Sequence, residues 1–287
     1  MIPAHSFVAK INERAKGALV VTYVGGPEVM EPPSQAIGVS NGVIDGAFTM
    51  AAIYAGLVPG IESLTLSKLS VAEERQRGYY DYLNKEKYNK AGLYFLGKAH
   101  DGTNQKWFSI WTVKKVASPK DMVGKRIAGT SPAINEFLKG LNAAPAVIGL
   151  MDLYTAIERG VVDGHWITRQ DTVTYGLMSV ERYMIDHPVG TSSMTQYVNL
   201  KFWNQLPKNL QDIVQTAANE VSTEFGAVFD AQDAKDRQAM EKAGIQFVAF
   251  SPADVESWYN TFYTTSWAEF VKRYPDFGPQ IKEMLTK

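Results

Sequence analysis

The sequence predicts an α/β protein of two lobes, bridged by one long helix. Three observations carry this prediction: amphipathic helices alternate with short apolar strands, a five-residue motif occurs twice, and helical apolar spacing continues over residues 206–242. A helix of that length spans roughly 50 Å, which exceeds one small lobe. We therefore expect one lobe from residues 1–104 and 193–232, a second from 105–192 and 233–287, and a ligand cleft between them.

The repeated motif is GV[IV]DG, at residues 42–46 and again at 160–164. In each copy a helical segment precedes the motif and apolar residues follow it. Glycine suits the end of a helix because it adopts the left-handed conformation at little cost. The repeat therefore predicts that each lobe contains a similar helix-to-strand unit.

The second copy lies within the stretch that the chain is organised around. An amphipathic helix there ends at Gly160, and a strand is expected to begin at Val161. In open α/β sheets, ligands bind beyond the carboxyl ends of strands. This places His165, Trp166 and Arg169 first among the candidate ligand contacts.

The first part of the chain follows the same alternating pattern. Expected elements, in order, are a helix ending at Gly17, a buried parallel strand over 18–24, a helix over 33–42, a strand after the first motif, a tyrosine-rich helix over 71–90 and a strand over 93–96.

The rest of the chain continues it. Expected elements are strands over 107–113, from 126 to 128, over 145–150 and over 245–250, helices over 132–141 and 206–242, and a final aromatic helix that begins after the cap Ser251.

Composition excludes several classes of protein. The 29 basic and 30 acidic side chains give a net charge of −1, so no basic field for nucleic acid exists. The chain has no cysteine, which excludes disulfides and thiolate metal sites. No run of 18 apolar residues could span a membrane, and the N-terminus lacks the regions of a signal peptide.

Catalytic and metal-binding motifs are also missing. The sequence has no H-E-x-x-H, G-x-S-x-G or phosphate-loop spacing, and its four histidines are scattered. We therefore expect no cofactor, no metal and no enzymatic activity. The alternative that stays open is a cytosolic α/β isomerase or lyase acting on a small carboxylate, with His165 as general base and Arg169 as anion binder.

Four segments together carry a family resemblance, and they follow one another in the family's order. They are IGVSNGVIDGAF, SPKDMVGKRI, LYTAIERGVVDG and YVNLKFWNQLPKNLQDIVQTAANE, beginning at residues 37, 118, 153 and 197. In these segments the chain resembles the periplasmic solute receptors of TRAP-type (tripartite ATP-independent) transporters.

The resemblance implies a periplasmic-binding-protein-like clam shell that closes over a small solute and docks on a membrane permease. It also implies secretion to the periplasm, so we expect a leader peptide, and the family's first strand, to be absent from this chain. Partners would be the solute and the permease subunits, with the chain a monomer or a dimer.

The chain departs from the family where the solute carboxylate is usually held. Ala128 stands at the position of a family arginine, and His165 and Trp166 begin the segment where the family commonly has Q-E-N-P. Leu150 stands where the family often has an aromatic wall residue. A second family arginine is replaced near Trp107.

We hypothesise that Arg169 takes over as the anion anchor, because its planar fork can pair with a carboxylate. Trp166 and Trp107 would stack on a flat or apolar solute, and Met50 and Tyr54 are candidate contacts from the facing lobe. A neutral or cationic solute would need no replacement anchor. The expected function is a receptor for a small organic acid, aromatic acids included. Beside this receptor and the enzyme alternative, a sensor with the same clam shell is the third hypothesis.

Overall fold

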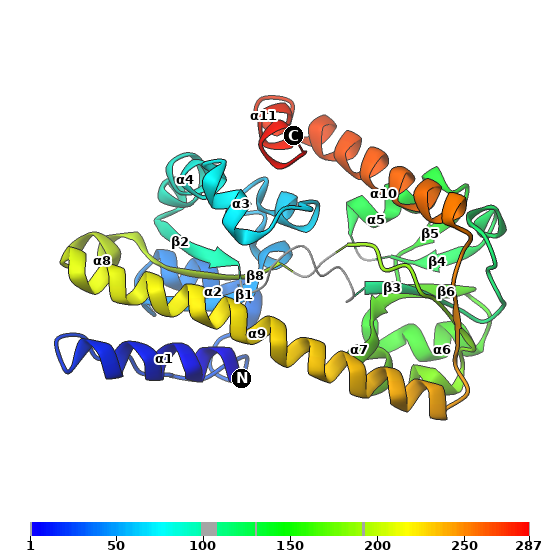
Figure 1. The fold of residues 1–287 in the computed structure, drawn as a ribbon, viewed down its shortest axis with the longest axis horizontal. Coiled ribbons are helices and arrows are strands. Elements are labelled where there is room, and N and C mark those ends of the chain that lie inside the picture. Colours follow the sequence, from blue (N-terminus) through cyan, green and yellow to red (C-terminus); the bar gives the residue numbers. More distant parts are fainter. Residues whose placement is uncertain (1, 99–107, 130, 191–192, 287) are drawn as a thin grey trace. The chain divides into compact units, whose positions relative to one another are not determined.

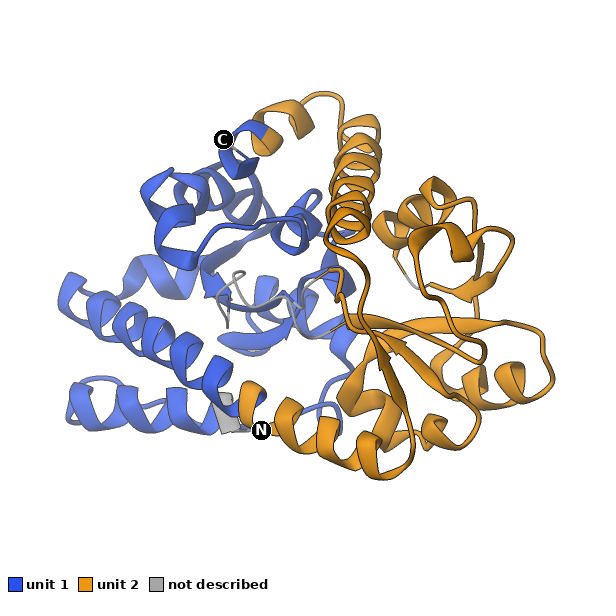
Figure 2. Ribbon diagram, turned by 45° about the vertical axis from the view of Figure 1, so that its right-hand side comes forward, with its two compact units in different colours: residues 1–103, 193–229, 283–287 blue, residues 104–192, 230–282 orange. Residues whose placement is uncertain are grey.

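The structure is a computed structural model that describes residues 2–98, 108–129, 131–190 and 193–286 (Figure 1). The chain divides into two compact units, coloured separately in Figure 2. Unit 1 comprises Met1–Thr103, Ser193–Phe229 and Glu283–Lys287, and unit 2 comprises Asn104–Ser192 and Asp230–Lys282. The C-terminal residues 283–287 thus group with unit 1, whereas the sequence had placed them in the second lobe.

Unit 1 is built on a three-stranded antiparallel sheet. Strand β8 (Met194–Asn199) lies between β1 (Gly46–Met50) and β2 (Leu93–Lys98). Its longer helices are α1 (Ile2–Ala15), α2 (Pro32–Ser40), α3 (Val71–Gln76), α4 (Tyr79–Leu83) and α8 (Leu200–Gln205), with 3-10 turns at Ala51–Tyr54, Ile61–Thr65 and Asn89–Ala91.

The predicted tyrosine-rich helix is interrupted. Gly78, with φ of 74°, separates α3 from α4, and α4 continues as a π-helical turn over Asn84–Tyr88. Tyr79, Tyr80 and Tyr88 are buried, so the tyrosines form a packed face. An ion pair of 2.6 Å between the fully buried Lys98 and Glu74 joins β2 to α3.

The prediction of a buried strand over residues 18–24 is wrong. The segment is extended, but no strand pairs with it among the described residues, so its ladder of backbone hydrogen bonds is not formed. The Asn12 side chain instead bonds the backbone N–H and C=O of Val21, each at 2.8 Å. Leu19 and Val21 pack on the core, while Val20 is 72% exposed.

Unit 2 contains a six-stranded sheet with one strand reversed. The order is β5 (Ala144–Ala146), β4 (Arg126–Ala128), β6 (Gly164–Thr168), β3 (Phe108–Thr112), β7 (Tyr183–Ile185) and β9 (Gln246–Val248). Among the described strands of this sheet, only β3 runs antiparallel to its neighbours. The carboxyl ends of the other five strands therefore lie at one edge, beside the start of β3.

Helices cover this sheet through two apolar clusters. On one side Trp111, Ala128 and Met184 share a core with α6 and the end of the long helix. In the other cluster Phe137 packs edge-on against Trp258 and Phe262. The helices are α5 (Pro132–Gly140), α6 (Leu153–Glu158), α7 (Arg169–Thr174) and α10 (Pro252–Arg273), with 3-10 turns at Pro119–Met122, Leu150–Asp152 and Leu177–Ser179, and with α11 (Gly278–Thr286) divided between the units.

The long helix predicted over 206–242 is confirmed as α9 (Lys208–Lys242). It changes unit after Phe229, as the colour change in Figure 2 shows. Val214 and Ala217 pack into the core of unit 1, and Met240 packs into that of unit 2. No helix of the described residues has the length and apolar character needed to cross a membrane.

The two copies of GV[IV]DG serve the same purpose in the two units. Gly42 and Gly160 end helical segments with φ of 75° and 67°. Gly46 and Gly164 begin strands β1 and β6 where a neighbouring backbone approaches closely. The repeat therefore marks equivalent helix-to-strand turns, as predicted, although β6 begins at Gly164 and not at Val161.

Gly164→Ala should destabilise the protein by about 3 kcal/mol. An added Cβ would lie 2.0 Å from the backbone oxygen of Trp111, which has no room to move within the sheet. Urea unfolding would measure the loss.

Gly226→Ala is the matched control, because a Cβ at that position in α9 meets nothing within 4 Å. It should raise stability by up to about 1 kcal/mol. Equal effects of the two substitutions would contradict the close approach at Gly164.

Candidate functional site

The carboxyl edge of the unit 2 sheet carries two of the side chains that the sequence singled out, Arg169 and Trp166. β4 leads to Gly129, β6 to Arg169 and β7 to Asp186. Phe108 begins β3 at the same edge, because β3 runs in the opposite direction. Loops at such an edge are where open α/β sheets bind ligands, so this edge is the candidate site.

Arg169 begins α7 directly beyond β6. Thr168 caps the helix, its hydroxyl accepting a hydrogen bond from Asp171 N–H at 3.0 Å. This turn places the guanidinium of Arg169 against two carboxylates, and the side chain is 5% exposed. Nη1 donates to Asp233 of α9, and Nη2 lies 3.3 Å from Oδ1 of Asp186.

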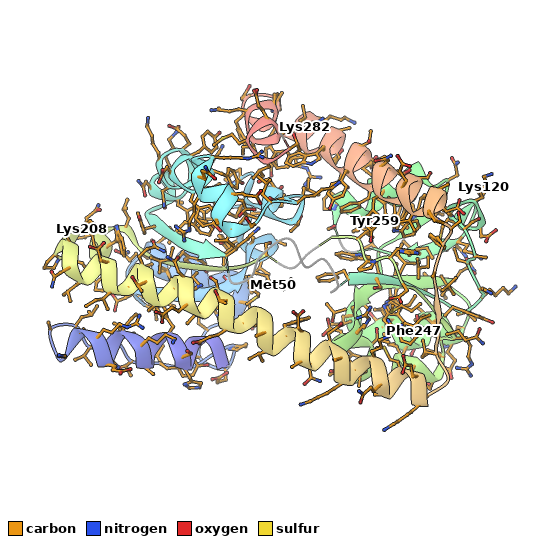
Figure 3. All side chains as sticks on the ribbon, in the orientation of Figure 1. Met50, Lys120, Lys208, Phe247, Tyr259 and Lys282 are labelled. Carbon is orange, nitrogen blue, oxygen red and sulfur yellow. The ribbon has the colours of Figure 1, made fainter. Side chains whose placement is uncertain are left out.

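Arg169 is one member of a chain of alternating charges. Nη1 of Arg237, one turn beyond Asp233 on α9, contacts both oxygens of Asp186 at 3.0 and 3.1 Å. The Arg237 guanidinium lies 3.9 Å from the ring centre of Phe247 on β9, a residue labelled in Figure 3. The network therefore fastens the unit 2 part of α9 to the ends of β6 and β7.

Electrostatics at this network follow from burial. Burial raises the pKa of Asp233 above its ordinary value, and the charge and hydrogen bond of Arg169 lower it only in part. Burial, together with the charge of Asp186, raises the pKa of the nearby Tyr259 hydroxyl. The balance of the Arg169 charge rests instead on its ion pairs with Asp186 and Asp233.

Trp166 lies beside this network with its indole fixed in place. Its Nε1 donates to the carbonyl of Val189 at 2.9 Å. Its ring stacks on Phe108, with centroids 4.3 Å apart and an interplanar angle of 19°. The side chain is half-buried, so part of the indole reaches the surface. Trp107, the second tryptophan proposed from the sequence, falls outside the described residues.

His165 faces the interior of unit 2 and not the edge. Its side chain is fully buried, and Nε2 lies 2.6 Å from Oε1 of the equally buried Glu181, in an alignment that makes no hydrogen bond. Its ring is nearly parallel to that of Trp111, with centroids 6.3 Å apart. A side chain in this position has no path to a solute at the edge.

Ala128 and Leu150 also belong mainly to the unit 2 core. Ala128 pairs with His165 across β4 and β6 and is buried. Leu150, half-buried, packs against the same cluster. Neither side chain carries a polar group, so each could contribute shape alone to a bound ligand.

The two candidates from unit 1 differ in exposure. Met50, labelled in Figure 3, is the last residue of β1 and is half-buried. Tyr54 is buried, and its hydroxyl bonds those of Tyr88 and Thr195 at 2.6 and 2.5 Å. Burial raises the pKa of Tyr54 well above its ordinary value. Tyr54 is therefore an interior residue of unit 1.

Sequence reasoning missed Phe108, Asp186 and Asp233. Asp233 and Arg237 stand four residues apart on one helix face, a spacing visible in the sequence. Nothing in the sequence indicated that this face meets Arg169. Among the described residues no group of three or more His, Asp or Glu side chains could hold a metal ion.

Comparison with known proteins finds relatives that are named as solute-binding or periplasmic binding proteins. A solute-binding protein of Albidiferax ferrireducens is 22% identical over 276 residues, covering 92% of this chain and 79% of the relative. A monocarboxylate 2-oxoacid-binding periplasmic protein of a Nostoc species is 23% identical, covering 87% and 70%.

Solved structures share the fold. A TRAP periplasmic solute binding protein from Desulfovibrio salexigens, with bound orotic acid, superposes with a TM-score of 0.79 at 19% identity, covering 99% of this chain and 92% of that one. The two-lobed α/β fold with a long helix, predicted from the sequence, is therefore confirmed.

The family model described as bacterial extracellular solute-binding protein, family 7, matches residues 2–273. This match covers nearly the whole chain, and the chain therefore belongs to that family of TRAP-type solute-binding proteins.

Proposed function

We propose that this protein is the extracytoplasmic receptor of a TRAP transporter, and that it captures a small organic acid and delivers it to membrane permease subunits. The observation that carries the proposal is the family match over residues 2–273. The family consists of solute-binding proteins and is not a family of enzymes. Its extracellular character supports a periplasmic location.

The acid class is supported by what the relatives bind. One relative is named for monocarboxylate 2-oxoacids, and the solved structure holds orotic acid. Both ligands are small carboxylic acids. Carboxylates gain charge-assisted hydrogen bonds from a protein site, which gives such a receptor affinity without covalent chemistry.

The proposed solute site is the carboxyl edge of the unit 2 sheet, with Trp166 and Phe108 as its aromatic part. Leu150 adds apolar surface there, and the contact of Met50 with the solute stays a prediction from the sequence. We leave His165 and Tyr54 out of the proposed site because both are buried in the interior of their units.

Arg169 requires a more specific role than that of a free anion anchor. Asp186 and Asp233 already neutralise it, so a solute carboxylate would have to share or displace these partners. Nε of Arg169 is buried and has no hydrogen-bond partner among the residues that the structure describes. We propose that Arg169 first positions α9 and that any bond to the solute comes from its remaining donors.

The enzyme alternative depended on His165 as a general base. A base must come within hydrogen-bond reach of the proton it removes. The complete burial of His165 against Glu181 and Trp111 places it away from any solute at the edge. The geometry therefore favours binding over catalysis at this site.

A thermal-shift screen with pyruvate, malonate, orotate and benzoate tests the receptor function. A cognate acid at a hundred times its dissociation constant should stabilise the protein by about 2.7 kcal/mol. The amide of each acid serves as its control, because it keeps the shape and loses the charge. Stabilisation by the amides alone, or by none of a wider set of acids, would contradict an organic-acid receptor.

Arg169→Met should destabilise the protein by roughly 3–5 kcal/mol without any solute, because it leaves Asp233 buried and unpaired. The double variant Arg169→Met, Asp233→Asn should recover part of this loss, since it removes both charges. Urea unfolding of the unaltered protein, of Arg169→Met, of Asp233→Asn and of the double variant measures the coupling.

Arg126→Met is the matched control in the same unit. Its ion pair with Asp163 is exposed, so its loss should cost less than about 1 kcal/mol. If Arg169→Met cost no more than this control, Arg169 would not position α9 and would be free to act as an anion anchor.

A further inference from the structure

The indole of Trp166 is covered on one face by Phe108. The two residues lie on the same face of the sheet, since Trp166 pairs with Ile110 and Phe108 is two residues before Ile110 on β3. Diagonal neighbours of this kind are within reach of aromatic side chains. The nearly parallel rings, 19° apart in orientation, form a two-layer stack.

One edge of the same indole is also fixed. The carbonyl of Val189 accepts the Nε1 hydrogen, and Gly190 follows with φ of 80°. A Cβ on Gly190 would lie 3.0 Å from Cζ2 of Trp166 but 3.9 Å from Cε2. A carbon above the ring would be almost equally close to both atoms, so Gly190 lies beyond the ring edge and not over a face.

Among the described residues, no aromatic ring lies on the second face of the indole. Among the ring contacts of the described residues, Phe108 alone covers Trp166, and the side chain is only half-buried. The ring needs no reorganisation to receive a flat group, because its orientation is set by a hydrogen bond and a stack. Pre-organisation of this kind lowers the entropic cost of binding.

The charge of Arg169 discriminates among solute acids less than the ring of Trp166 does. Arg169 begins α7 directly beyond β6, the strand that carries Trp166, and its charge is shared by Asp186 and Asp233. An acid bound here therefore gains less from the cation than it would from an unpaired arginine. The feature that discriminates among acids of equal charge is then the flat aromatic surface.

We propose that Trp166 is the specificity-determining residue of this receptor, and that the face of its indole opposite Phe108 stacks on planar, unsaturated carboxylic acids in preference to saturated ones of equal size. This inference rests on the proposed receptor function. An aromatic stack contributes on the order of ten-fold in affinity beyond the burial of its area.

Benzoate and cyclohexanecarboxylate are the probes, because they share a carboxylate and a six-carbon ring and differ in planarity. Calorimetric titration of the full chain at one pH and salt concentration should give about ten-fold tighter binding of benzoate. Trp166→Leu should remove this preference, and Trp166→Phe, which keeps a flat ring, should retain most of it.

Phe108→Leu is the second variant, for the case that Trp166→Leu does not fold. It leaves the indole in place and removes its backing, so the preference for benzoate should shrink without vanishing. Pyruvate binding reports on the site itself, since pyruvate has no ring to stack and its affinity should change little in Phe108→Leu.

Three results would overturn the stacking role: equal affinity for the two ring acids in the unaltered protein, an unchanged preference in Trp166→Leu, or no binding of either ring acid while pyruvate or malonate binds. The last result leaves the receptor function intact. Absence of binding by every acid of the wider screen would instead overturn the receptor function, and the stacking role with it.

Discussion

The ion pair between Arg169 and Asp233 is the contact on which the candidate site depends. Asp233 lies on α9 close to the point where the helix passes from unit 1 to unit 2, and Arg169 is the first residue beyond β6. Removing either charge would leave the other in a largely buried position, which is costly. One network thus joins α9 to the ends of β6 and β7. Asp186 belongs to this network, and the loop that it begins also carries Val189, which bonds Trp166.

Much of the fold could be predicted from the sequence, because local patterns determine its larger elements. The 35-residue helix α9 follows from apolar spacing, and the motif at residues 42–46 and 160–164 follows from glycine's backbone freedom. The segment 18–24 shows the limit of such patterns. Its β-branched residues do favour an extended backbone, but a strand also requires a hydrogen-bonding neighbour, which a local pattern does not reveal.

The site was only partly predictable, for a related reason. The expected position beyond a strand is correct for Arg169, whereas Trp166 lies within β6. This expectation did not reveal that Arg169 meets Asp233, 64 residues later in the chain, or that His165, one residue before Trp166, points to the opposite face. Alternation along a strand sends neighbours to opposite faces, and the sequence alone did not say which face was the core. Phe108 was missed because its partner lies on another strand.

The chain combines the fold of its family with a candidate site whose arginine is paired with acids of the chain itself. Ala128, where the resemblance implies a family arginine, is buried against the core, and Arg169 at the edge is balanced by acids of the chain itself. A guanidinium that is already paired with carboxylates attracts a further anion less than an unpaired one does. Neither of them discriminates much among carboxylates. In the proposed role of Trp166, selectivity comes from shape, and the Trp166 and Phe108 stack is a feature of fixed shape among the described residues of this edge. Such a site would distinguish acids by the planarity of their carbon skeleton more than by their charge.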